Sequence, residues 1–200
     1  MMGGRFIVFE GIDGAGKSTQ IARLRAALEQ MGYAVHQTAE PTELDTGRML
    51  REALAGKMAR SAAEMAALFT LDRIAHNKEI GEALAAGQIV ICDRYYYSSL
   101  AYQGSLCDYE WVKQMNVGCP EIRRPDLCVF LDLAPRDAIA RISARGEAAE
   151  IYEKEETLAL FRDTFHRVFA SLEDRVAIVD AAPAPDKIAA AVIAAVQEIL

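Results

Sequence analysis

One segment near the start of the 200-residue chain combines the residue types that bind phosphate groups. Residues 11–18 read Gly-Ile-Asp-Gly-Ala-Gly-Lys-Ser and fit the pattern G-x-x-x-x-G-K-[ST]. Glycines let backbone N–H groups turn inward around phosphates, Lys17 neutralises their charge, and the Ser18 hydroxyl can ligate Mg²⁺. The segment lies between an apolar run and a helical pattern, and a helix N-terminus adds partial positive charge. These features predict a nucleotide-binding loop; the alternative is a glycine-rich turn without a ligand.

Carboxylates end four apolar runs of the sequence, at Glu10, Asp93, Asp132 and Asp180. The carboxyl ends of strands form ligand sites in open α/β sheets, but a carboxylate there can also cap the next helix. We favour capping for Asp132 and Asp180. Asp93 occupies the place of a carboxylate that holds Mg²⁺ through water, and Arg94 follows it directly. This pair suits a site where two anionic groups meet.

An aromatic residue and an arginine share one face of a long predicted helix. Phe69 and Arg73 are four residues apart, so they could stack a base and hold a phosphate together. Spacing alone favours the ordinary alternative, which is core packing for Phe69 and a surface ion pair for Arg73.

A tyrosine-rich stretch, DRYYYSSLAYQG, occupies residues 93–104. If a helix begins at Ser98, then Ser99, Tyr102 and Gln103 project from one side. Such a side could read the edges of a base; the alternative is a packing seam rich in tyrosine.

The segment at 140–156, ARISARGEAAEIYEKEE, is charged and contains no apolar run. Arg141 and Arg145 are four residues apart and therefore share a helical face. The segment is either a solvated helix end or a mobile lid near 141–153 that carries arginines to a transferred phosphate. Phosphoryl transfer favours a lid, because water must be excluded from the reaction.

Apolar runs rich in β-branched residues predict the strands that position these groups: Phe6–Phe9, Ile89–Cys92, Leu127–Leu131, Val176–Val179 and, more weakly, Ala34–Thr38. Helical patterns lie between them, at about 20–31, 61–86, 153–172 and 187–200. Strands that are apolar throughout and alternate with helices indicate a parallel sheet covered on both faces. No repeat or linker divides the chain, so we expect one domain over residues 1–200.

Composition excludes several classes of protein. A net charge of −7 argues against a general nucleic-acid binder, and 52% hydrophobic residues exclude intrinsic disorder. No apolar stretch approaches the roughly 18 residues of a membrane span, and the N-terminus is not typical of a signal peptide. Four cysteines without C-x-x-C spacing predict a cytoplasmic chain with reduced thiols. His36, His76 and His166 form no triad or zinc pattern, so we expect structural or surface roles.

Several stretches together resemble the thymidylate kinase family of P-loop nucleoside monophosphate kinases: FEGIDGAGKSTQ at 9–20, EPT at 40–42 with TGRMLRE following, LFTLDRIAH at 68–76, ICDRYYYSSLAYQG at 91–104 and PDLCVFLDL at 125–133. The resemblance implies an α/β, three-layer P-loop NTPase fold with a five-stranded parallel sheet flanked by helices. It also implies a homodimeric enzyme that moves the γ-phosphate of ATP to dTMP, giving dTDP and ADP with Mg²⁺.

The resemblance implies site residues for both substrates. The ATP-binding positions correspond to Gly11, Ile12, Asp13, Gly14, Ala15, Gly16, Lys17, Ser18 and Thr19, and the metal positions to Ser18 and Asp93. The dTMP-binding positions correspond to Asp13, Arg51, Phe69, Arg73, Arg94, Ser99, Tyr102 and Gln103. The catalytic positions correspond to Lys17, Arg94, Arg141 and Arg145.

Charged residues of the acceptor set have the following implied roles. Arg73 and Arg94 would hold the acceptor phosphate and base, and Asp13 would contact the sugar. Arg51 resembles a further phosphate contact.

Uncharged residues of the same set would recognise the nucleoside. Phe69 would stack on thymine, and Ser99 and Gln103 would read the base. Tyr102 would crowd the 2′ position and so favour deoxyribose.

The chain departs from the family pattern at three places, one of which is the lid, where AAEIYE at 148–153 replaces a stretch that commonly includes arginine. Residues 40–44 read Glu-Pro-Thr-Glu-Leu where the family often has EPGGT. Gly14 stands where some members carry an arginine in the loop, which resembles members whose catalytic arginine lies in the lid, here Arg141 or Arg145. Two other functions stay open: a kinase for another nucleoside monophosphate, and a regulatory P-loop switch that controls a partner.

Overall fold

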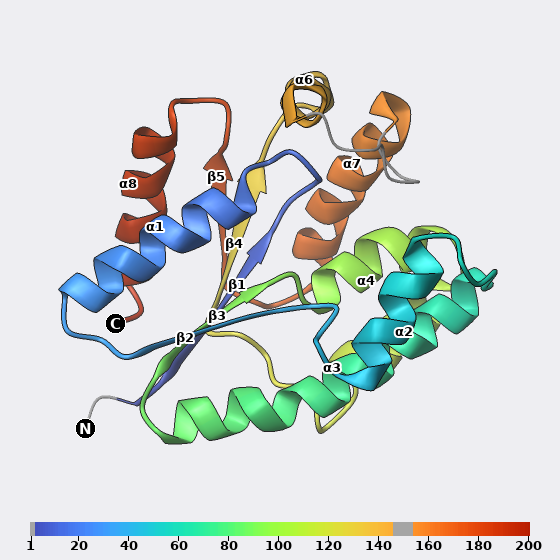
Figure 1. Cartoon of the computed structure of the whole chain (residues 1–200), viewed down its shortest axis with the longest axis horizontal. Coiled ribbons are helices and arrows are strands. Elements are labelled where there is room, and N and C mark those ends of the chain that lie inside the picture. Colours follow the sequence, from blue (N-terminus) through green and yellow to red (C-terminus); the bar gives the residue numbers. More distant parts are fainter. Residues whose placement is uncertain (1–2, 146–153) are drawn as a thin grey trace.

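A five-stranded, all-parallel β-sheet carries the candidate site residues at its carboxyl edge (Figure 1). The computed structural model describes residues 3–145 and 154–200. The strands are β1 (Arg5–Glu10), β2 (Val35–Ala39), β3 (Ile89–Asp93), β4 (Leu127–Asp132) and β5 (Val176–Asp180), in the order β2-β3-β1-β4-β5. All five lie where the apolar runs predict them, and every pair is parallel.

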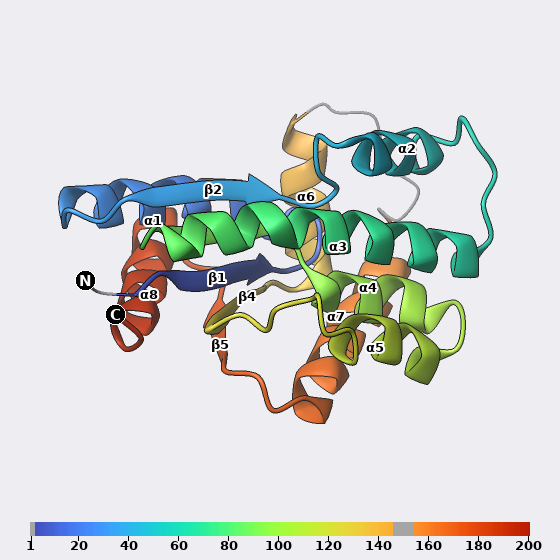
Figure 2. The ribbon, with the colours of Figure 1, turned by 90° about the horizontal axis from the view of Figure 1, so that it is seen from below.

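Helices cover both faces of the sheet. They are α1 (Lys17–Gln30), α2 (Asp45–Leu54), α3 (Ala62–Ala85), α4 (Tyr96–Tyr102), α5 (Tyr109–Val117), α6 (Pro135–Arg145), α7 (Glu155–Ser171) and α8 (Pro185–Gln197). Helices α1 and α8 pack side by side on one face, and α3, α4 and α7 lie on the other (Figures 1 and 2). The predicted three-layer α/β fold is therefore confirmed.

The central strand β1 sets the position of the site. Residues 6–10 are all buried, because β3 and β4 flank this strand and helices cover both of its faces. The chain runs from β1 to β2 and β3 on one side, and then crosses to β4 and β5 on the other. In open α/β sheets such a change of direction leaves a crevice at the carboxyl ends of the strands. The nucleotide-binding loop follows β1 and Asp93 is the last residue of β3, and both strands border this crevice.

Aromatic packing fixes α4 and α7 to the sheet and to each other. The ring of Phe130 in β4 lies 5.3 Å from that of Phe165 and 5.0 Å from that of Phe169, both in α7. Tyr102 at the end of α4 lies 4.3 Å from the ring of Phe161 in the same helix α7. Aromatic pairs at these distances add to the free energy gained by burial. Helix α4, which carries several predicted acceptor residues, is thereby packed against α7.

The structure differs from the sequence prediction in several elements. Helices α2 and α5 were not predicted, and α4 begins at Tyr96 rather than at Ser98. Asp132 does not cap α6, because Arg162 of α7 binds its carboxylate at 2.6 and 2.9 Å. Asp180 does not cap α8, since its carboxylate accepts the N–H of Ala182 before that helix begins. The predicted capping role is thus wrong for both carboxylates.

Candidate active site

The glycine-rich segment forms the loop between β1 and α1, as predicted. Gly14 and Gly16 have φ values of 82° and 94°, a region that favours glycine. A Cβ on Gly14 would lie 2.6 Å from the carbonyl oxygen of Ala138, so the loop packs closely on α6. The loop thus has both the curvature and the support needed to direct its N–H groups inward.

Lys17 is buried at the start of α1 and lies within this loop. Its Nζ donates hydrogen bonds to the carbonyl oxygens of Gly11 at 2.9 Å and Ile12 at 3.4 Å. Burial, with a contribution from Arg94, lowers the pKa of Lys17 below its ordinary value. A buried ammonium of this kind gains from a nearby anion, which is the property required for binding phosphate.

Ser18 and Asp93 line one cavity of about 440 Å³ beside the loop. Oδ1 of Asp93 is a buried atom without a hydrogen-bond partner in residues 3–145 and 154–200. No cluster of three or more His, Cys, Asp or Glu residues that could hold a metal occurs in that part of the chain. Mg²⁺ commonly binds through one or two protein oxygens together with water and substrate phosphates. The donor set of Ser18 and Asp93 therefore fits Mg²⁺ that is shared with a nucleotide.

Arg94 has a backbone conformation rare among side-chain-bearing residues. Its φ of 67° is the only positive value at a non-glycine residue in the described ranges. Its guanidinium forms an ion pair with Asp13 and donates to the hydroxyls of Ser98 at 3.2 Å and Tyr102 at 3.3 Å. Burial opposes the charge on Arg94, but Tyr102, Asp13 and Glu10 hold its pKa well above the ordinary value. Arg94 therefore stays cationic between the loop and α4.

Glu10 is a site residue whose role the sequence does not reveal, beyond its place at a strand end. It is fully buried, and its Oε1 accepts the N–H groups of Tyr95 at 2.9 Å and Ser98 at 3.1 Å. Its Oε2 accepts the Ser98 hydroxyl at 2.7 Å. Burial raises the pKa of Glu10 to about 7, although Arg94 and these hydrogen bonds oppose the shift. The carboxylate joins the end of β1 to the start of α4 and supports the turn that carries Arg94.

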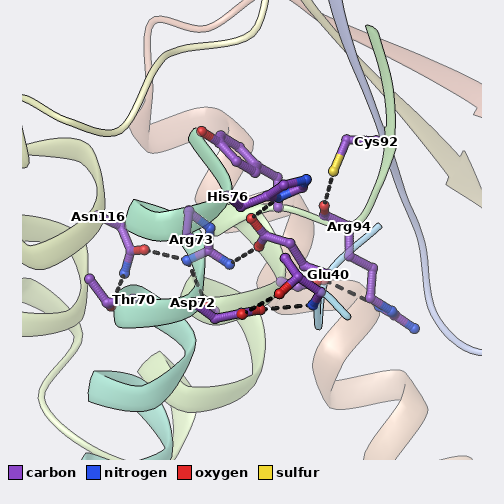
Figure 3. A network of polar contacts seen from close by, with 12 residues as sticks. Glu40, Thr70, Asp72, Arg73, His76, Cys92, Arg94 and Asn116 are labelled. Atoms are coloured by element: carbon purple, nitrogen blue, oxygen red, sulfur yellow. Dashed lines mark hydrogen bonds and ion pairs between the residues drawn. The ribbon is translucent and has the colours of Figure 1, made fainter. Parts of the chain in front are cut away.

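Arg73 lies at the centre of a buried polar network (Figure 3). Its guanidinium donates to Glu40 at 2.5 Å, to the Ser99 hydroxyl at 3.1 Å and to Oδ1 of Asn116. Glu40 also accepts from Nδ1 of His76 when that nitrogen is protonated, at 3.1 Å. Nε of Arg73 is buried without a partner among the described residues. The alternative of a surface ion pair is wrong, because Arg73 is only 1% exposed.

Arg51 of α2 holds the loop that follows β2. Its Nη1 donates to the carbonyl oxygens of Pro41 at 3.0 Å and Thr42 at 2.7 Å, and its Nη2 contacts Glu43 at 3.0 Å. Arg51 thus holds the loop in place, in addition to its predicted contact with a phosphate.

A cavity of about 740 Å³ opens beside the nucleotide-binding loop. Its lining includes all eight residues expected on the acceptor side: Asp13, Arg51, Phe69, Arg73, Arg94, Ser99, Tyr102 and Gln103. Glu40 and Pro41 also line it, although sequence reasoning did not select them. The neighbouring Tyr95 ring lies 5.2 Å from the guanidinium carbon of Arg73, so the arginine is supported on its face as well.

Of the two predicted lid arginines, the structure describes the side chain of Arg141 but not that of Arg145. Nη2 of Arg141 donates to the carbonyl oxygen of Ala181 at 2.8 Å. Its Nη1 lies 3.9 Å from the position that a Cβ on Gly16 would take, so Arg141 is beside the nucleotide-binding loop. Arg145 ends α6, but its side chain and residues 146–153 lie outside the described part of the chain.

The fold and the loop define the class of P-loop nucleotide-binding proteins. A family model described as thymidylate kinase matches residues 9–192. The chain is 40% identical over 208 aligned positions to the thymidylate kinase of Solidesulfovibrio magneticus, covering 98% of this chain and 100% of that protein. It is 45% identical to the thymidylate kinase of Akkermansia muciniphila, covering 84% and 80%, and 42% identical to a probable thymidylate kinase of Pyrococcus horikoshii, covering 74% and 75%.

The chain therefore belongs to the thymidylate kinase family, and it is a phosphotransferase. In residues 3–145 and 154–200, every helix is too short or too polar to cross a membrane.

The raised pKa of Glu10 predicts a pH dependence of stability. The folded state holds the proton of Glu10 up to a pH of about 7, whereas the ordinary pKa is 4.5. The contribution of this group is therefore fully present below pH 4.5 and is lost as pH rises toward 7. Relative to a Glu10→Gln variant, we expect the free energy of unfolding of the wild type to fall by about 3 kcal/mol between pH 4 and 8. Urea unfolding of both proteins across this range measures the difference; parallel pH curves would contradict the assignment.

Proposed function

We propose that this protein catalyses the transfer of the γ-phosphate of ATP to dTMP, giving dTDP and ADP, in the presence of Mg²⁺. The observation that carries the proposal is the cavity beside the nucleotide-binding loop, which gathers eight side chains suited to a nucleoside monophosphate. The thymidylate kinases to which the chain is similar carry names that agree with this acceptor. The proposed place of action is the cytoplasm, within one domain that includes a lid near 141–153.

The donor side of the proposed reaction consists of the loop from Gly11 to Thr19. Its backbone N–H groups and the N-terminus of α1 would bind the ATP phosphates. Lys17 would exchange its contacts with the Gly11 and Ile12 carbonyl oxygens for contacts with phosphate oxygens. Ser18 and Asp93 would hold Mg²⁺, which supplies positive charge to the phosphates when it is bound.

The acceptor side would bind dTMP through groups that are already oriented. Phe69 would stack on the base, and Arg73, which also lines the cavity, would hold the acceptor phosphate or base. Ser99 and Gln103 would contact base edges. Tyr102, whose hydroxyl accepts from Arg94, would occupy the space of a ribose 2′-hydroxyl.

The chemical step needs little beyond positioning and charge. An oxygen of the acceptor phosphate attacks the γ-phosphorus, and the bond from that phosphorus to the β–γ bridging oxygen breaks. The acceptor phosphate is already ionised, so no general base is required. Arg94 would lie between the two substrates, because it contacts both the Gly11 carbonyl oxygen and α4. Arg141 and Arg145 would stabilise charge on the transferring group.

A panel of nucleoside monophosphates tests the proposal. We expect dTMP to give the fastest ADP release, and the ribose form to be markedly slower because of Tyr102. A folded Lys17→Ala protein should lose most of the phosphotransfer activity, since this lysine supplies charge rather than packing. Faster turnover of UMP or CMP would contradict dTMP as the acceptor. ATP hydrolysis without any phosphorylated acceptor would instead indicate a regulatory switch.

The lid arginines generate a second prediction. Arg141→Ala should lower turnover by about 10³-fold, as loss of a catalytic arginine does in comparable enzymes, and change the KM for dTMP only a few-fold. Arg136→Ala is a suitable control, because Arg136 is an exposed arginine of the same helix. Steady-state kinetics of these variants, of Arg145→Ala and of the Arg141/Arg145 double variant would separate the contributions. Wild-type turnover in the double variant would refute the role.

Dimerisation through α3 is a further part of the proposal. Ala63, Ala67 and Leu71 follow one another at four-residue spacing on the exposed face of this helix, and Leu71 is 51% exposed. We expect light scattering to give about twice the chain mass of 21.9 kDa at micromolar concentration. Ala67→Glu should weaken the dimer while the helix stays intact. A wild-type species of single-chain mass alone would count against this surface.

A further inference from the structure

Asp72 of α3 is a buried carboxylate that lines neither cavity and has no part in the proposed chemistry. It is 1% exposed and directly precedes Arg73. Burying a carboxylate is costly unless hydrogen bonds compensate for the lost water. Oδ2 accepts the N–H of Thr42 at 2.9 Å, and Oδ1 accepts the hydroxyls of Thr42 and Thr46, each at 2.6 Å. All three donors belong to the loop after β2 and to the first turn of α2.

Helix α2 depends on this attachment more than a typical helix does. It has ten residues, of which Gly47 and Leu50 are buried, and isolated helices of this length are marginal in water. Its N-cap, Leu44, provides no capping side chain within the described structure. A Cβ on Gly47 would lie 1.9 Å from the carbonyl oxygen of Thr42, so the helix is pressed against the loop. Asp72 binds both parts of this junction.

The junction leads directly to the wall of the acceptor cavity. Arg51 and Leu54 in the second half of α2 line that cavity, and so do Glu40 and Pro41 of the loop. Arg51 also donates to the carbonyl oxygens of Pro41 and Thr42. A shift of the loop relative to α3 would therefore move one wall of the cavity while Arg73, on α3, stays in place.

We propose that Asp72 is a positioning residue for the acceptor nucleotide: it fixes the loop at 40–44 and helix α2 against α3, and thereby sets the width of the acceptor cavity. The inference rests on the proposed function, in which this cavity binds the phosphate acceptor. It assigns to Asp72 a larger effect on acceptor binding than on the donor side, where Thr42 of the same loop lines the cavity of about 440 Å³ together with Ser18 and Asp93. The donor loop is built on β1, α1 and α6, none of which contacts Asp72 through these three bonds.

Asp72→Asn is the informative substitution, because it retains the shape of the side chain. One carboxylate oxygen becomes an NH₂ group that cannot accept a hydrogen bond from Thr42 or Thr46. We expect the KM for dTMP to rise about tenfold or more, as loss of a charged hydrogen-bond acceptor implies. The KM for ATP should change less than about twofold, and kcat only a few-fold.

Thr46→Val is the milder second variant. Thr46 is partly exposed, and its hydroxyl makes one of the three bonds to Asp72. We expect the KM for dTMP to rise about two- to tenfold. The KM for ATP should again change less than about twofold. If Asp72→Asn does not fold, this variant alone decides the question.

Asp126→Asn is the matched control. The Asp126 carboxylate also accepts a backbone N–H, that of Phe6 at 2.7 Å, but at the amino-terminal end of the sheet, away from both cavities. The Asp126→Asn substitution should lower the melting temperature without changing the KM for dTMP or the KM for ATP. An Asp72→Asn protein that is merely less stable, with unchanged KM for dTMP, would overturn the inference; so would an equal rise of both KM values.

The wild-type acceptor panel separates this inference from the proposed function. If the wild type phosphorylates another monophosphate better than dTMP, the proposed function fails. The same variants are then assayed with that better acceptor. A rise in its KM caused by Asp72→Asn would still support the positioning role, and an unchanged KM would still overturn it.

Discussion

Three buried or partly buried cations, Lys17, Arg73 and Arg94, lie at the candidate site of a protein whose net charge is −7. Each of these cations loses hydration on burial, and like charges repel more strongly away from water. Each cation therefore needs a partner within the protein when no substrate is bound, since an enzyme passes through that state in every cycle. Carbonyl oxygens of the loop bind Lys17, Glu40 binds Arg73, and Asp13 binds Arg94. Anionic substrates can therefore exchange partners with cations that are already in place.

Two further buried carboxylates, Glu10 and Asp72, organise backbone around these cations. Helices α2 and α4 begin at N-caps, Leu44 and Tyr95, that provide no capping side chain in the described structure. Glu10 accepts N–H groups at the start of α4, and Asp72 binds the Thr46 hydroxyl in the first turn of α2. A capping group from another element ties the start of the helix to the tertiary structure. Both helices carry residues that line the cavity of about 740 Å³. Because Glu10 belongs to β1 and Asp72 to α3, the positions of α2 and α4 depend on those two elements.

The fold was predictable from sequence because parallel strands buried on both faces are apolar throughout, as β1 and β4 are. The eight residues expected on the acceptor side came from the family resemblance, and the structure brings them into one cavity. The roles of Glu10, Glu40 and Asn116 were not predictable, since their partners lie 33 to 88 positions away in the sequence. Helix α5 did have a local signal: Asp108 caps it by accepting the N–H of Trp111, three residues later. The Arg141 contact beside Gly16 likewise needed the packing of α6 on the loop.

The candidate site has two parts, the nucleotide-binding loop and the cavity beside it, and the sequence encodes them differently. Arg94 contacts both parts. The nucleotide-binding loop is one contiguous segment, so a local pattern suffices to recognise it, whereas the cavity of about 740 Å³ draws on five segments that only the fold brings together. A left-handed backbone costs a residue with a side chain about 1–2 kcal/mol. At Arg94 it lets one guanidinium reach the Gly11 carbonyl oxygen, Asp13, Ser98 and Tyr102. These hydrogen bonds offset the conformational cost, because charged donors contribute about 1.5–3 kcal/mol each when well paired. The hydrogen bonds that stabilise this turn therefore also hold the Arg94 guanidinium between the nucleotide-binding loop and α4.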